Sequence, residues 1–192
     1  MLASLRRVLL TAYVDESYDL TIGVYILTAS IVDGADSAGV LAALHELRPR
    51  GGKLHWYESD AAHRLDLAKA VGALELEHMT VIGRGCGART ERARRKCMER
   101  LLPDLDGAGV DTVVLEARQQ ANNRHDINMV DACRRKKLIS QGLHVTFALG
   151  HVQPLLWLAD VACGSVLASQ RGEHGYLEQF GEAARIEFVD VN

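Results

Sequence analysis

Apolar runs and amphipathic stretches alternate along this chain, a pattern typical of an α/β fold. The apolar runs at 9–15, 78–83, 111–118 and 144–149 predict strands, and the first of them has no clearly polar face, as in a central strand. A β-rich run at 20–32 follows a predicted turn at 16–19, which indicates a hairpin with the first strand. A run at 186–191 predicts an additional edge strand.

Helical spacing of apolar residues fills the segments between these strands. It predicts helices at 37–47, 60–76 and 90–105, and a further helix that follows a polar loop at 122–126 and ends near residue 140. Pro49, Gly51 and Gly52 interrupt the first of these segments. Thr90 is the expected N-cap of the third helix.

The segment 153–168, QPLLWLADVACGSVLA, predicts a helix that is buried on most sides, because it has almost no polar face. Asp160 lies in its middle, and its helical neighbours three and four residues away are apolar. A buried carboxylate is costly unless it is protonated, hydrogen-bonded or bound to a cation. Asp160 is therefore expected to have such a partner.

Composition narrows the class of protein. The 192 residues are 48% hydrophobic and contain no Pro/Ser/Gly-rich linker, which predicts one domain over 1–192. A formal net charge of −3 argues against coating nucleic acid by bulk charge, so nucleic-acid contact would be local. The four cysteines form no CxxC pair and are expected to be reduced thiols of a cytoplasmic protein. Residues 1–10 lack the features of a signal peptide or membrane span, so no membrane association is expected.

Two further acids close predicted strands. Asp15 and Glu116 each lie at the carboxyl end of an apolar strand, where sites form in open α/β sheets. If both converge with Asp160, their repulsion raises at least one pKa or requires a divalent cation, and Mg²⁺ or Mn²⁺ suits such hard oxygen ligands. Two such ions about 4 Å apart promote phosphodiester hydrolysis. For each acid taken alone, a turn or cap role is the alternative.

The most basic part of the chain is the segment 84–100. Ala93, Cys97 and Leu101 form an inward stripe of the predicted helix, so that its arginines face solvent. This surface is either a solvated helix face or a contact for nucleic-acid phosphates. Its candidate nucleic-acid-binding residues are Arg89, Arg92, Arg94, Arg95 and Lys96.

Three more acids and one histidine are candidates for the surroundings of the site. Asp126 either caps a helix or reaches the site as a further metal ligand. The segment 53–60, KLHWYESD, either closes the core with its aromatic residues or forms the edge of a site through His55 and Glu58. Glu16, next to Asp15, is a third candidate for the site edge.

The motifs AYVDES near the N-terminus and FALGHVQPLLWLAD near the C-terminus resemble the bacterial family called domain of unknown function 3800. That family has an Asp-Glu-Ser-Gly signature at the end of its first strand, and a C-terminal helix that opens with Gln and then Ala-Asp. The resemblance implies a ribonuclease H-like fold with a five-stranded mixed sheet flanked by helices. It also implies that metal-binding acids lie on the first strand, the fourth strand and the last helix, which correspond to Asp15, Glu116 and Asp160.

Two residues depart from the pattern of this family. Tyr18 replaces the Gly of the signature, and the fourth-strand acid is Glu116 where related nucleases commonly have Asp. The longer side chain of Glu116 changes the expected metal geometry.

Three functions compete on these observations. The first is a Mg²⁺-dependent nuclease or related phosphoryl-transfer enzyme, with Asp126 or Glu58 as a fourth ligand. The second is a non-catalytic ribonuclease H-like scaffold that acts through protein partners. The third is a zinc site for small-molecule hydrolysis formed by His55, Glu58 and His63, whose spacing matches no common zinc motif.

Overall fold

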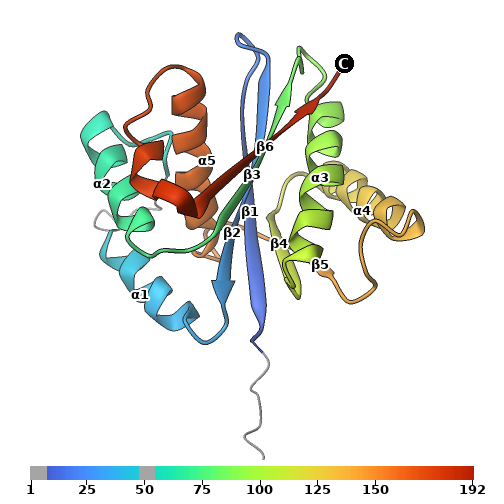
Figure 1. The fold of residues 1–192 in the computed structure, drawn as a ribbon, viewed down its shortest axis with the longest axis horizontal. Helices are drawn as coiled ribbons and strands as arrows, with labels where there is room; N and C mark the ends of the chain where they lie inside the picture. The colour runs from blue at the N-terminus through green and yellow to red at the C-terminus, as the bar shows by residue number, and fades with distance from the viewer. Residues whose placement is uncertain (1–7, 48–54) are drawn as a thin grey trace, which may run out of the picture.

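The computed structural model describes residues 8–47 and 55–192, and they form three layers (Figure 1). A mixed sheet lies between α1, α2 and α5 on one face and α3 and α4 on the other. The strands are β1 (Leu10–Asp19), β2 (Val24–Asp33), β3 (His78–Arg84), β4 (Thr112–Glu116), β5 (His144–Ala148) and β6 (Ala184–Asp190). The helices are α1 (Ser37–Glu46), α2 (Ala61–Gly72), α3 (Thr90–Gly107), α4 (Gln120–Arg135), α5 (Leu156–Gln170) and the 3₁₀ helix η1 (Leu177–Ala183).

The sheet has the strand order β5-β4-β1-β2-β3-β6. β2 is antiparallel to both of its neighbours, and the other pairs of adjacent strands are parallel. The α/β class and the mixed sheet are therefore as predicted. The expected count of five strands is wrong for the described residues, because the predicted C-terminal edge strand pairs with β3 and makes a sixth.

Alternating side chains of the strands form two separate cores. Ala12 and Val14 of β1 pack with the residues of α3 and α4, whereas Tyr13 packs with those of α2 and α5. In β4, Val113 and Leu115 belong to the first core and Val114 to the second. This alternation determines which face each polar residue at the strand ends takes.

The β1–β2 hairpin is longer than predicted. β1 continues through the segment 16–19 that the sequence assigns to a turn, and the turn itself lies at 20–23. The pairing continues to Asp19 opposite Val24, and Gly23 ends the turn with a φ of 67°. Asp19 stabilises the turn because its Oδ1 accepts the Thr21 backbone N–H at 2.9 Å. Since β4 ends at Glu116, this extension of β1 passes beyond its parallel neighbour.

Several helix boundaries also differ from the predictions. The polar segment 122–126 belongs to α4, so Asp126 lies within a helix and does not cap it. Arg89 holds the N-cap position of α3, and Thr90 is the first helical residue. α2 ends at Gly72, and α5 begins at Leu156, after the turn that contains Pro154.

Three other predictions concern the chain as a whole. All four cysteines are free and buried, as expected for reduced thiols. Among the described residues, no helix is both long and apolar enough to cross a membrane. The predicted break at 49–52 lies outside the described residues, as do residues 1–7 and 53–54.

Candidate functional site

The sheet and α5 bring the three predicted acids to one place. Val14 of β1 pairs with Leu115 of β4, so the next residues, Asp15 and Glu116, lie at the same level of two adjacent parallel strands. Their neighbours Tyr13 and Val114 face the core beneath α5, and the alternation of strand side chains gives Asp15 and Glu116 this same face. α5 packs against β1 on this side.

Electrostatics show that these acids interact. The pKa of the Asp15 carboxyl is raised well above its usual value, first by burial and then by the negative charges of Asp160 and Glu116. A side-chain hydrogen bond with Glu116 raises this pKa further. The Glu16 backbone N–H donates to Asp15 Oδ1 at 2.8 Å and opposes the shift. Three acids from distant parts of the chain therefore share one electrostatic environment.

Asp160 is partly accessible, although the residues around it are buried. Leu156, Trp157 and Cys163 on the same helix are buried, as predicted, while 21% of the Asp160 side chain is exposed. The backbone N–H of Trp56 donates to Asp160 Oδ2 at 3.0 Å. The helix therefore carries a carboxylate that opens to solvent beside a turn from another part of the chain.

That turn belongs to the segment predicted as the edge of a site. His55 Nδ1 lies 3.9 Å from Asp160 Oδ2, so His55 borders the acids. Glu58 is exposed. Trp56 is buried and packs edge-to-face on Tyr176, with ring centroids 5.2 Å apart. The two alternatives predicted for this segment were a role in the core and a place at the edge of a site. Trp56 closes the core, and His55 lies beside Asp160.

The donor atoms fit a hard divalent cation by their chemistry, but they are not arranged as a complete ligand cage. Three carboxylates that repel one another are the oxygen ligands that Mg²⁺ or Mn²⁺ prefers. Within residues 8–47 and 55–192, however, no three His, Cys, Asp or Glu side chains are positioned to hold a metal ion. The same finding leaves the zinc hypothesis for His55, Glu58 and His63 without structural support.

Glu16 points to the opposite face of the sheet and joins a buried charge network there. Its Oε2 accepts hydrogen bonds from Tyr25 Oη and from Arg94 Nη1. Arg94 also donates to both oxygens of Asp126, through Nε at 2.9 and 3.1 Å and through Nη2 at 2.9 Å. Burial would lower the pKa of Arg94, but Tyr25, Asp126 and Glu16 outweigh it and raise this pKa above its usual value.

Arg94 corrects one prediction from the sequence. The arginines of α3 were expected to face solvent, yet only 3% of Arg94 is exposed. Arg94 lies in the polar stripe of the helix sequence, yet it is buried because two acids from other elements pair with it, one on β1 and one on α4. Arg94 therefore has a structural role that its neighbour Arg95, which is exposed, does not share.

Arg118 completes this network, although it was not predicted from the sequence as a site residue. Its Nη2 donates to Asp126 Oδ1 at 3.0 Å, and its Nη1 donates to Glu91 at 2.6 Å. Asp126, a candidate metal ligand, thus lies between two guanidinium groups. A signal was present in the sequence, since Arg118 lies two residues after the strand-end acid Glu116 and so near the same sheet edge.

A small cavity of about 120 Å³ connects the acids with this network. It lies where β4 has ended and β1 continues. Its lining contains three acids and both arginines of the network: Val14, Asp15, Glu16, Arg94, Glu116, Ala117 and Arg118. Two of the three candidate acids, Asp15 and Glu116, therefore border the same space as Arg94 and Arg118.

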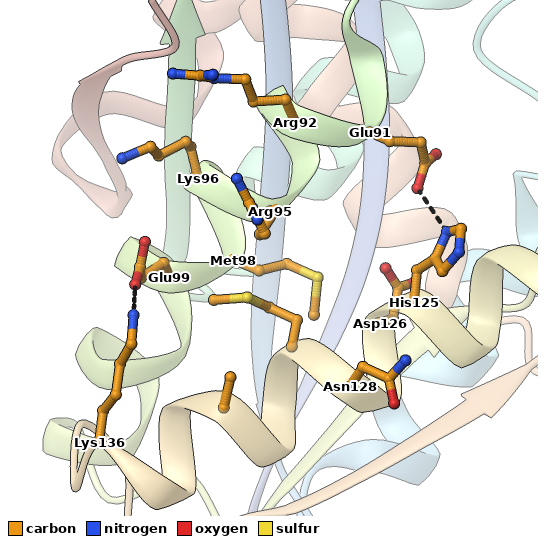
Figure 2. Close-up of a pocket in the computed structure, with 12 residues that line it drawn as sticks. Glu91, Arg92, Arg95, Lys96, Met98, Glu99, His125, Asp126, Asn128 and Lys136 are labelled. Atoms are coloured by element: carbon orange, nitrogen blue, oxygen red, sulfur yellow. Dashed lines mark hydrogen bonds and ion pairs between the residues drawn. The ribbon is translucent and has the colours of Figure 1, made fainter.

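A larger groove of about 690 Å³ lies between α3 and α4 (Figure 2). Figure 2 shows Arg92, Arg95 and Lys96 along the α3 side of the groove and Met98 on its floor. Asp126 borders the groove from α4 and pairs with the two arginines that line the small cavity. Arg89 is exposed at the start of α3 but does not line the groove.

Charge pairing leaves a cationic surplus on the α3 side. Glu91 pairs with Arg118, and Glu99 accepts a hydrogen bond from Lys136 Nζ at 2.7 Å. Arg92 donates through Nε to the Val191 carbonyl, which leaves its charge without an acidic partner in that contact. The groove therefore favours an anionic ligand along α3.

No protein-family model matches this sequence, and no curated protein is detectably similar to it.

Proposed function

We propose that this protein is a Mg²⁺- or Mn²⁺-dependent nuclease, or a related phosphoryl-transfer enzyme, with a ribonuclease H-like fold. The observation that carries the proposal is the half-buried carboxyl of Asp15, which meets the negative charges of Asp160 and Glu116. Such repulsion is unfavourable unless a proton or a cation relieves it. Mg²⁺ or Mn²⁺ would be held by Asp15, Glu116 and Asp160.

The arrangement of elements supports the proposed fold and the resemblance to the domain of unknown function 3800 family. The resemblance implies acids on the first strand, the fourth strand and the last helix, and the three acids lie on β1, β4 and α5. The free, buried cysteines agree with the proposed cytoplasmic location.

Bound metal ions would activate a water molecule and stabilise the leaving oxygen of a phosphodiester. The protein's own groups hold the ligands in place. The Glu16 backbone N–H orients Asp15, and the Trp56 backbone N–H orients Asp160. His55 lies 3.9 Å from Asp160, where it can contact a bound substrate.

The substrate proposed for this site is nucleic acid. Its phosphates would contact the accessible cations of this surface, of which Arg92, Arg95 and Lys96 line the groove and Arg89 lies at the start of α3. Arg94 is excluded from this surface, because it is buried in the charge network. The contact is local, in keeping with the net charge of −3.

Cleavage of labelled single- and double-stranded DNA and RNA tests the proposal. The wild type should cleave at least one of them with Mg²⁺ or Mn²⁺ and none with a chelator. Asp15→Asn should abolish cleavage, whereas Asp66→Asn, which changes an exposed carboxylate on α2, should not. Cleavage that persists unchanged in Asp15→Asn would overturn the proposed site.

The second candidate is a non-catalytic scaffold that acts through protein partners. One observation favours it, namely that none of the described residues form a ready three-ligand arrangement. The same assay separates the two candidates, because a scaffold cleaves no substrate with either metal.

A further inference from the structure

Tyr57 is an exposed aromatic residue that follows Trp56, whose backbone N–H binds Asp160, and no contact in the described part of the chain explains its exposed ring. With 88% of its surface exposed, it is the most exposed large hydrophobic residue that the structure describes. Other aromatic rings have partners: Tyr18 stacks on Tyr25, and Phe188 lies under the guanidinium of Arg84. A single exposed ring is common on protein surfaces, so its meaning depends on how it is held.

The backbone around Tyr57 is fixed by several hydrogen bonds. Arg64 donates through Nε to the Trp56 carbonyl at 3.0 Å and through Nη2 to the Tyr57 carbonyl at 3.1 Å. Ser59 closes the turn, since its backbone N–H donates to the Trp56 carbonyl and its hydroxyl to the His55 carbonyl. These bonds therefore fix the backbone that carries Tyr57.

The turn itself is built onto α5. The ring of Trp56 lies directly on Gly164, where an added Cβ would come within 2.3 Å of the ring. The Trp56 backbone N–H binds Asp160, one helical turn before that glycine. Tyr57 directly follows Trp56, and consecutive Cα atoms are about 3.8 Å apart. The backbone of Tyr57 therefore lies close to the contact between Trp56 and the acidic cluster. An exposed ring is thus carried on a turn whose backbone contacts the acidic cluster.

We infer that Tyr57 is a stacking platform for an unpaired nucleobase, so that the substrate is single-stranded or locally unpaired nucleic acid. This inference rests on the proposed function, which brings nucleic acid to the acids. Base–aromatic stacking needs an open face of a base, and in a duplex the neighbouring base pairs cover that face. A pre-fixed backbone loses little conformational entropy on binding, so more of the stacking energy contributes to affinity.

Fluorescence anisotropy with a labelled single strand and the corresponding duplex tests this role. The measurements use the Asp15→Asn background with Mg²⁺, so that cleavage does not interfere. Tyr57→Ala should weaken single-strand binding about tenfold and leave duplex binding unchanged, whereas Tyr57→Phe should stay within about twofold of the parent. Phe188→Ala, which removes another exposed ring on the outer strand β6, should change neither affinity.

An abasic single strand identifies the group that stacks. It should bind the parent more weakly than the normal strand does, and Tyr57→Ala should cause no further loss. Equal affinities of Tyr57→Ala and the parent for the normal strand would overturn the inference, as would an equal loss with the abasic strand. Because anisotropy does not depend on cleavage, a protein that never cleaves can still show the Tyr57 effect, and an active nuclease can lack it.

Discussion

Asp15 and Glu16 are consecutive residues of β1, and they serve opposite faces of the sheet. Asp15 meets Glu116 and Asp160 beneath α5, while Glu16 pairs with Arg94 beneath α3. Because strand side chains alternate with a period of two, a shift of one residue in the register of β1 would exchange these environments. The Asp-Glu pair therefore links the candidate catalytic face to the charge network on the other face of the sheet.

The neutral variant Asp15→Asn should stabilise the metal-free protein at neutral pH. Burial and the neighbouring charges raise the pKa of Asp15 in the folded state, so folding favours its protonated form. The stability that protonated Asp15 contributes is present below the pKa that this group has in the unfolded chain. It is lost as the pH rises through the raised pKa of Asp15 in the folded protein. Asparagine removes that loss.

Urea unfolding of both proteins as a function of pH measures this effect in the presence of a chelator. The advantage of Asp15→Asn should grow from acid to neutral pH. A variant less stable than the wild type at neutral pH would contradict the repulsion among the three acids.

The Arg94–Asp126 pair should be a major determinant of stability. Arg94→Met leaves Glu16 and Asp126 without their shared buried cation, which should cost about 3–5 kcal/mol. Arg95→Met changes the adjacent, exposed arginine and should stay within about 0.5 kcal/mol of the wild type. Denaturant unfolding distinguishes the two, and equal costs would show that burial of Arg94 has no energetic consequence.

His78 should make the protein sensitive to acid. Only 1% of it is exposed, and burial lowers its pKa from 6.5 to about 4. Its Nδ1 lies 2.8 Å from the Ser30 hydroxyl, and its Nε2 has no hydrogen-bond partner among the described residues. The unfolded chain takes up a proton at this histidine below its ordinary pKa, whereas the folded chain does not.

Stability should therefore fall by about 3 kcal/mol through His78 as the pH decreases from 6.5 to about 4. His78→Gln keeps a polar group beside Ser30 but does not titrate. The difference in unfolding free energy between the two proteins should change over this pH window, and parallel pH profiles would contradict the assignment.

The basic side of the groove should contribute a salt-dependent term to nucleic-acid binding. Arg95→Glu should weaken binding and reduce the slope of log affinity against log salt by about 1 or more. Lys69→Glu makes the same change of charge at an exposed position of α2 and is the matched control. Equal effects of the two variants would mean that α3 contributes only to the overall charge.

Most elements of the fold could be predicted because strand and helix periods are local properties of the sequence. The convergence of Asp15 and Glu116 could also be predicted, since parallel strands end at one edge of the sheet, whereas the place of Asp160 was implied by the family resemblance. The extension of β1 was missed because its polar residues resemble a turn, yet pairing of Tyr18 with Tyr25 keeps the strand intact.

The buried network could not be predicted, because its stability comes from residues on different elements. The position of Arg94 in a basic helix indicates a solvated face, and only Glu16 of β1 and Asp126 of α4 make its burial favourable. The start of α4 was missed for a related reason. The first turns of α4 are polar and resemble a loop in the sequence. In the structure they are helical, and Asn123 within them accepts at 2.9 Å the backbone N–H of Arg118, which lies just before the helix.

Calorimetric titration of Mn²⁺ into the wild type and into Asp160→Asn tests most directly whether the three acids share a cation. The wild type should bind the ion, and loss of a ligand should weaken binding by more than the roughly 10- to 100-fold typical of changes in groups that only support ligands. Asp66→Asn, the exposed control on α2, should bind as the wild type does. No binding by the wild type, or equal affinity of the wild type and Asp160→Asn, would contradict the proposed metal site.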